Sequence, residues 1–174
     1  MRHIISVLVE NKFGVLARIA GLFSGRGYNI ESLSVNATEN EDISIMTIVT
    51  RGDDHIIEQI IKQLRKLVNT IKVRDVTQVD HIERELALLK VHATQRTRPD
   101  ILSIIETFRG KVVDITKESL VVEITGDQNK LNAIINVLEP YGIIEIIKSG
   151  TIAIARGNKS TTDFTKQDIK SQEE

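Results

Sequence analysis

The chain of 174 residues contains no cysteine, and its aromatic residues are four phenylalanines and two tyrosines. Without cysteine, disulfides, thiolate metal sites and thiol catalysis are excluded. No apolar run approaches the length of a membrane span, and the apolar run after Arg2 is too short for the hydrophobic part of a signal peptide. These absences predict a cytoplasmic protein with no membrane partner.

Strong charge of either sign is also missing, because 23 Lys and Arg residues face 24 Asp and Glu residues. The net charge of −1 provides no global field that would attract nucleic acid or an anionic membrane. The four histidines lack metal-ligand spacing and no Ser/His/Asp motif is present, so we predict surface or interface histidines, no catalytic residue and no metal site. These histidines are His3, His55, His81 and His92.

Hydrophobic periodicity predicts the same order of elements twice. In the first half, strands are expected at residues 4–10, 28–37, 43–51 and 71–79, with helices at 15–25 and from Asp53 to about residue 68. In the second half, strands are expected at residues 85–94, 111–116, 120–125 and 143–147, with helices beginning near Pro99 and at 127–140. The pattern predicts an α+β fold of two tandem ferredoxin-like β-α-β-β-α-β domains.

The domain boundary is placed in the charged connector at residues 80–85. We therefore expect domains at 1–80 and 81–157, with a polar and disordered tail at 158–174. The short apolar run at 151–155 is placed as an extension of the second sheet. The strand at 43–51 carries apolar residues on both faces, which predicts that a partner or the second domain covers the open face of the first sheet.

The turn between the first strand and the first helix has the composition of a binding site. Backbone N–H groups at the start of a helix lack intrahelical partners and favour a carboxylate or a phosphate. Gly14 allows a close approach, and the side-chain carbonyl of Asn11 accepts from a ligand ammonium group or caps the helix. Both interpretations, a site for a zwitterion and a simple N-cap, stay open at this stage.

Two other classes share single features with this chain. RNA-binding domains use the same topology, but they need stacking aromatics and basic groups on the third strand, and residues 43–49 supply neither. The glycines at 21, 25 and 27 are spaced like part of a phosphate loop, although they end a helix and lack the Gly-Lys-Ser/Thr ending. We therefore predict no nucleic-acid partner, and helix capping for these glycines.

Several segments are similar to the small, regulatory subunit of acetolactate synthase, whose N-terminal part is an ACT domain, a module that senses small molecules. In many ACT turns a proline occupies the position of Phe13. The similar segments, which lie between residues 1 and 157, are ISVLVENKFGVLAR at 5–18, GLFSGRGYNIESL at 21–33, QLRKL at 63–67, EREL at 83–86, FRG at 108–110 and SG at 149–150.

The resemblance implies a non-catalytic subunit that binds and activates a catalytic subunit in branched-chain amino acid biosynthesis and makes it sensitive to valine. Thiamine diphosphate, Mg and FAD are then expected on the catalytic partner and no cofactor on this chain. The alternative is a free-standing ACT-type amino-acid sensor acting on another enzyme. In the family the effector sits where the ACT domains of a homodimer meet. The effector-binding residues carried over are Asn11, Gly14, Val15 and Leu16 from one chain and Asn29 and Ile30 from the other.

Overall fold

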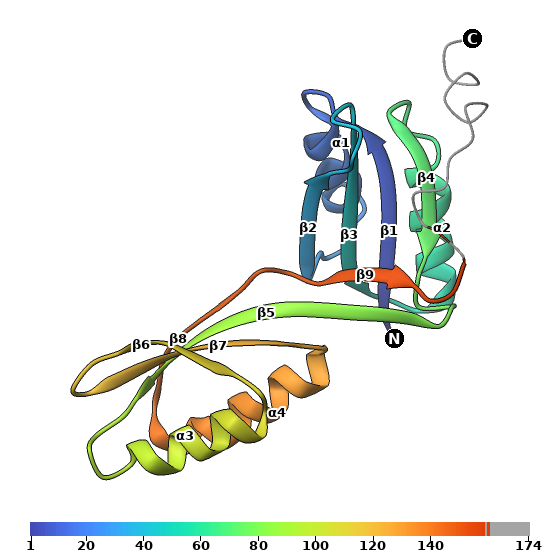
Figure 1. Ribbon diagram of the computed structural model, residues 1–174. Coiled ribbons are helices and arrows are strands. Elements are labelled where there is room, and N and C mark those ends of the chain that lie inside the picture. The colour runs from blue at the N-terminus through green and yellow to red at the C-terminus, as the bar shows by residue number, and fades with distance from the viewer. Residues whose placement is uncertain (159, 161–174) are drawn as a thin grey trace. The chain divides into compact units, whose positions relative to one another are not determined.

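The computed structural model describes residues 1–158 and residue 160. The chain divides into two compact units (Figure 1), which are residues 1–82 together with the segment that begins at Thr151, and residues 83–150. The tail predicted at 158–174 lies outside the described residues except for Asn158 and Ser160. Within the described part of the chain, no helix is long and apolar enough to cross a membrane.

The first unit has the order that periodicity predicted. Its antiparallel sheet has the strand order β2-β3-β1-β4, and both helices lie on one face of it (Figure 1). Ile5, Val7 and Val9 of β1 face the helices, since alternate residues of a strand point to one side of the sheet. The elements are β1 (Arg2–Glu10), α1 (Val15–Ser24), β2 (Ser32–Ala37), β3 (Ile43–Arg51), α2 (Asp54–Leu64) and β4 (Thr70–Asp75).

The second unit repeats this arrangement. Its strands run in the order β6-β7-β5-β8, and α3 and α4 cover one face of the sheet (Figure 1). The two ferredoxin-like repeats predicted from the sequence are thus confirmed. The elements are β5 (His81–His92), α3 (Arg98–Thr107), β6 (Lys111–Ile115), β7 (Ser119–Gly126), α4 (Gln128–Leu138), a 3-10 turn η1 (Glu139–Tyr141) and β8 (Ile143–Lys148).

Several predicted boundaries differ from the structure, and α2 ends at Leu64 and not near residue 68. β2 begins at Ser32 and not at residue 28, because Tyr28 N–H bonds back to the carbonyl of Phe23 at 2.9 Å. β4 ends at Asp75, whose side chain accepts from Thr77 N–H and forms a turn. β5 begins at His81, so most of the predicted connector at 80–85 belongs to a strand.

The segment that follows the second unit belongs to the first one. β9 (Ile152–Ala155) pairs with β5, as the extension that we predicted, yet the segment from Thr151 groups with residues 1–82. Ala153 packs against Ile4 and Val49, which point away from the helices of the first unit. The predicted cover of this face is therefore provided, at one end, by the returning chain itself.

His3 corrects another expectation, because we predicted a surface or interface histidine and its side chain is fully buried. Its Nδ1 lies 3.3 Å from Asp75 Oδ2, and its Nε2 lies 3.8 Å from Asp54 Oδ1. His3 thus joins the start of β1 to the end of β4. Its burial was not visible in the sequence because both neighbours lie more than fifty residues away.

Candidate functional site

The turn from β1 to α1 contains a glycine that its backbone conformation requires. Gly14 is the N-cap of α1 and has φ +81°, in the left-handed region that favours glycine. A Cβ atom built on Gly14 would meet nothing within 4 Å. The position therefore demands glycine for its conformation and leaves open space in front of the helix.

The first turn of α1 presents backbone donors to this space. Arg18 N–H bonds to the carbonyl of Gly14 at 2.9 Å, while Val15 N–H makes only a long contact of 3.4 Å with the carbonyl of Lys12. Among the described residues, the N–H groups of Leu16 and Ala17 have no hydrogen-bond partner. Together with the helix dipole, these donors favour an anionic group such as a carboxylate.

Asn11 does not cap the helix, so the simple N-cap interpretation of this residue is wrong. Its backbone N–H donates to the carbonyl of Asp42, and its Nδ2 donates to the carbonyl of Glu41, each at 2.7 Å. Three residues separate Asn11 from Val15, the first residue of α1, and Gly14 holds the capping position. The side-chain oxygen of Asn11 has no partner in the described part of the chain and is available to a ligand donor.

Two cations and an asparagine, which we did not predict, lie beside this turn. Lys12 Nζ lies 3.0 Å from Glu10 Oε1, and Asn69 Nδ2 donates to the other oxygen of Glu10. Asn69 also accepts from the guanidinium of Arg18. The hydrogen bond from Asn69, followed by that from Lys12, holds the pKa of Glu10 below its ordinary value. The network fixes the end of β1 beside the turn.

The apolar residues of the turn divide between the core and the surface. Val15 is buried in the core of the first unit, whereas Leu16 is 45% exposed and Phe13 at the tip is fully exposed. The basic residues on either side of the turn were visible in the sequence as a signal for anion binding. Asn69 had no such signal, because it reaches the site only through the packing of the segment before β4.

The two predicted halves of the effector site lie at opposite ends of the first sheet. Asn29 is exposed, and its carbonyl accepts from Thr50 Oγ1 at 2.6 Å. Thr50 lies opposite His3, and Ile43 lies opposite Glu10 at the other end of β1. Seven steps along a strand separate these two pairs, a distance of roughly 23 Å. One chain therefore brings Asn11, Gly14, Val15 and Leu16 together without Asn29 and Ile30.

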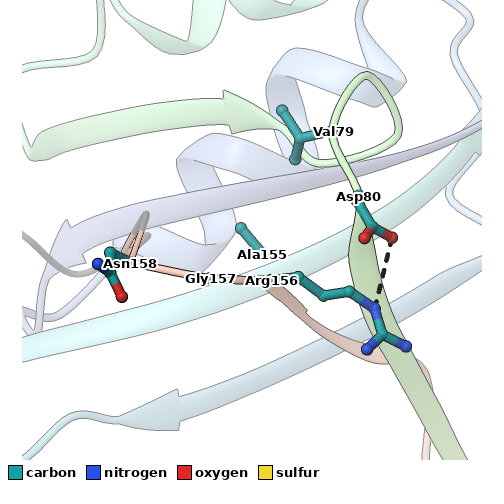
Figure 2. Close-up of a pocket in the computed structure, with 6 residues that line it drawn as sticks. All are labelled: Val79, Asp80, Ala155, Arg156, Gly157 and Asn158. Atoms are coloured by element: carbon teal, nitrogen blue, oxygen red, sulfur yellow. Dashed lines mark ion pairs between the residues drawn. The ribbon is translucent and has the colours of Figure 1, made fainter.

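Residues just before β5 and at the end of β9 border a hollow in the first unit. Val79, Asp80, Ala155, Arg156, Gly157 and Asn158 line a volume of about 460 Å³, which Figure 2 shows. Its charged groups are committed to each other, since Arg156 Nε lies 3.4 Å from Asp80 Oδ1 and Arg156 N–H bonds to the carbonyl of Asp80. Because these charged groups are paired with each other, the hollow presents fewer open polar groups to a ligand than the turn before α1 does.

Comparison with known proteins assigns both units. A family model described as "AHAS small subunit-like ACT domain" matches residues 5–72, and one described as "Small subunit of acetolactate synthase" matches residues 84–157. A probable acetolactate synthase small subunit from Archaeoglobus fulgidus is 52% identical over 91% of this chain and 99% of its own length. An acetolactate synthase small subunit from Aquifex aeolicus is 53% identical over 89% of this chain and 81% of its own length.

A solved structure agrees with these relatives. The crystal structure of the acetolactate synthase small subunit from Thermotoga maritima is similar with a TM-score of 0.83 and 40% identity, over 91% of this chain and 99% of that one. The family resemblance inferred from the sequence is therefore confirmed over both units. The chain belongs to the family of acetolactate synthase small subunits.

Proposed function

We propose that this chain is the non-catalytic regulatory subunit of a cytoplasmic acetolactate synthase. It binds the catalytic subunit, raises its activity and makes it sensitive to valine in branched-chain amino acid biosynthesis. The observation that carries this proposal is the identity of 52% with a probable small subunit over 91% of the chain. Thiamine diphosphate, Mg and FAD belong to the catalytic partner in this scheme, and the regulatory chain carries none of them.

The turn before α1 supports valine as the effector. The open N–H groups of Leu16 and Ala17 hold the valine carboxylate, which the helix dipole and the charge of Arg18 also attract. The side-chain oxygen of Asn11 accepts from the ammonium group. The exposed side chain of Leu16 supplies apolar surface for the branched side chain.

A second copy of the chain completes the site in this proposal. Asn29 and Ile30 lie at the far end of the sheet from the turn, so they reach a ligand only from another chain. A homodimer through the ACT domains brings the turn of one protomer to the Asn29 end of its partner. The dimer therefore places one valine site at each of two equivalent junctions.

Reconstitution with the catalytic subunit of the same organism tests the function. Acetolactate formation is measured for the catalytic subunit alone, for this chain alone and for the mixture, each with and without valine. We expect no turnover by this chain alone, stimulation in the mixture, and inhibition by valine only in the mixture. Turnover by the isolated chain, or a catalytic subunit that does not respond to it, refutes the proposal.

A further inference from the structure

Besides the pairing of Ser32 with Val49 in the sheet, four polar contacts in the described part of the chain hold residues 29–32, which contain the Asn29 half of the effector site. Three of these contacts lead to β3: Thr50 Oγ1 donates to Asn29 O at 2.6 Å, Arg51 pairs with Glu31 at 2.6 Å, and Glu31 N–H bonds to the carbonyl of Val49 at 2.8 Å. The fourth leads elsewhere. Thr151 N–H donates to Ser32 Oγ at 2.9 Å, across 119 residues of sequence.

Thr151 is the point at which the chain re-enters the first unit after the second unit has been completed. The residue is 5% exposed, so its N–H is shielded from water. Two residues further on, Ala153 packs against the apolar cluster of Ile4, Val49 and Val76. The returning chain is therefore held to the first unit by one hydroxyl and by this apolar contact at its start, and by the bond from Arg156 N–H to the carbonyl of Asp80 further along.

The segment between Thr151 and the second unit is short. Ser149 is tied to β5 by two hydrogen bonds, from its N–H to the carbonyl of Leu86 at 2.9 Å and from Leu86 N–H to Ser149 Oγ at 3.1 Å. Only Gly150, with φ +86°, stands between Ser149 and Thr151. Two peptide bonds thus connect Thr151, which is bonded to Ser32, with the edge of the second unit.

We propose that Ser32 passes the occupancy of the effector site to the second unit through its hydrogen bond with the Thr151 backbone. This inference rests on the proposed function and names how the same site is read out. A ligand that contacts Asn29 and Ile30 changes the position of residues 29–32. Within that segment, Ser32 is the residue whose side chain bonds to the returning chain. Ser32 is a positioning residue, because it touches the returning chain and not the ligand.

Two isosteric variants separate the hydroxyl from the shape of the side chain. Ser32→Thr keeps an oxygen acceptor, whereas Ser32→Val removes it at nearly the same volume, and both side chains suit a strand. Ser32→Ala is a second variant without the hydroxyl and adds no bulk. Ser34→Val is the matched control, because Ser34 lies on the same face of β2 and, among the described residues, its hydroxyl makes no hydrogen bond to the returning chain.

The experiment uses the full chain with the catalytic subunit, and valine as the probe. Ser32→Val and Ser32→Ala are expected to keep stimulation and the valine-induced rise in melting temperature. The ratio of activity without valine to activity with saturating valine should fall by about two- to tenfold, the range expected for losing one hydrogen bond from the coupling. Ser32→Thr and Ser34→Val should behave as the wild type.

Two results overturn the inference while leaving the proposed function intact. One is wild-type inhibition by valine in both hydroxyl-free variants. The other is loss of the valine-induced rise in melting temperature in those variants, because Ser32 then acts in binding itself. If the wild-type mixture shows neither stimulation nor inhibition, the proposed function fails and the inference fails with it.

Amide hydrogen exchange gives a readout that does not need the catalytic subunit. In the wild-type chain, valine is expected to change the exchange rate of the Thr151 N–H, which Ser32 protects. In Ser32→Val this N–H should exchange faster and at a rate independent of valine. An exchange rate of Thr151 that ignores valine in the wild type contradicts the inference.

Discussion

The two units share one topology and differ at the turn where the first strand enters the first helix. In the first unit, Gly14 leaves open space and unpaired donors before α1. In the second unit, Thr94 and Thr97 fill the same turn before α3 with their own hydroxyls. Thr94 N–H donates to Thr97 Oγ1 at 3.1 Å, and Thr97 N–H donates to Thr94 Oγ1 at 3.3 Å.

The helix that follows is also closed in the second unit. Arg98 reaches back and donates to the carbonyls of Ala93, Thr116 and Lys117, at 3.2, 2.7 and 3.0 Å. The second position of α3 is Pro99, which has no N–H, and Asp100 follows with a negative charge. In α1 the corresponding residues are Leu16 and Ala17, whose N–H groups are open.

The difference teaches that topology alone does not make a ligand site. Both turns stand at the end of a central strand and before a helix with the same dipole. The second turn bonds two of its N–H groups to hydroxyls, loses one donor to proline and repels anions with an aspartate, whereas the first turn leaves the N–H groups of Leu16 and Ala17 open. We therefore expect valine to bind at the first turn and not at the second.

The largest effect is expected for Gly14→Asp, which places a negative charge where the ligand carboxylate is proposed. The valine concentration for half-inhibition should rise at least about tenfold, since a charge-assisted contact is lost and repulsion is added. Gly14→Asn has the same size and tolerates positive φ equally well, so it is the control for charge. Both variants should lose about 1 kcal/mol of stability from backbone strain, and only the asparagine variant should keep a valine-induced rise in melting temperature.

The outcome of this pair separates charge from strain. Equal loss of valine inhibition in both variants would assign the effect to the conformation of Gly14. Normal inhibition in the aspartate variant would remove the turn before α1 from the effector site.

The next largest effect is a loss of valine affinity when a proline is placed in α1 at the position that Pro99 occupies in α3. Leu16→Pro removes one open N–H at a helix position where proline is tolerated, as Pro99 shows in α3. Valine should bind about tenfold more weakly to Leu16→Pro than to Leu16→Ala, which loses the side chain but keeps the donor. Isothermal titration calorimetry measures both affinities, and equal values would mean that this N–H does not touch the carboxylate.

A substitution in the second turn should affect stability and not the effector. Arg98→Met keeps the apolar stem but leaves three carbonyls without their charged donor, so the free energy of unfolding should fall by about 2 kcal/mol. Denaturant titration measures this loss. The half-inhibitory valine concentration should stay at the wild-type value, and a change in it would mean that the second turn takes part in regulation.

The smallest effect is a pH dependence confined to the first turn. The pKa of Glu10 is lowered by Asn69 and Lys12, so its ionised form stabilises the folded state above the unfolded pKa of about 4.3. This contribution is lost as the pH falls through the lower folded pKa. Glu10→Gln mimics the protonated acid and should therefore be less stable than the wild type at pH 7 and equally stable at pH 2.

Thermal melts of both proteins between pH 2 and pH 7 follow this difference in stability. A gap that stays constant over the whole range would show that the charge of Glu10 contributes nothing. His92 ends β5 where Glu10 ends β1, so the second unit has no carboxylate at the position of Glu10.

Local signals in the sequence predicted much of the fold. Asp53 and Asp127 were placed at the starts of two helices, and each carboxylate accepts from the N–H three residues on, at 2.8 Å. Gly14 and the strand-to-helix turn were also found from neighbouring residues. The role of Asn11 was left open between cap and ligand contact, and the cap was excluded only when Gly14 occupied that position.

Long-range contacts could not be predicted from the sequence. Asn69 meets Glu10 across 59 residues, and Thr151 meets Ser32 across 119 residues. The burial of His3 and the return of β9 to the first unit depend on packing of the same kind. No periodicity or spacing encodes such pairs, because their geometry exists only after the sheet has formed.

The sequence by itself determined the two β-α-β-β-α-β repeats, the helix starts and the glycine turn, because periodicity and capping depend on residues within one or two turns of chain. Only the tertiary structure decided which backbone donors stay open at Gly14, that Asn69 joins the network beside the turn and where the returning chain is held. These features arise when segments that are distant in sequence meet. The open donors of Leu16 and Ala17 and the bond from Thr151 to Ser32 are the results of that packing.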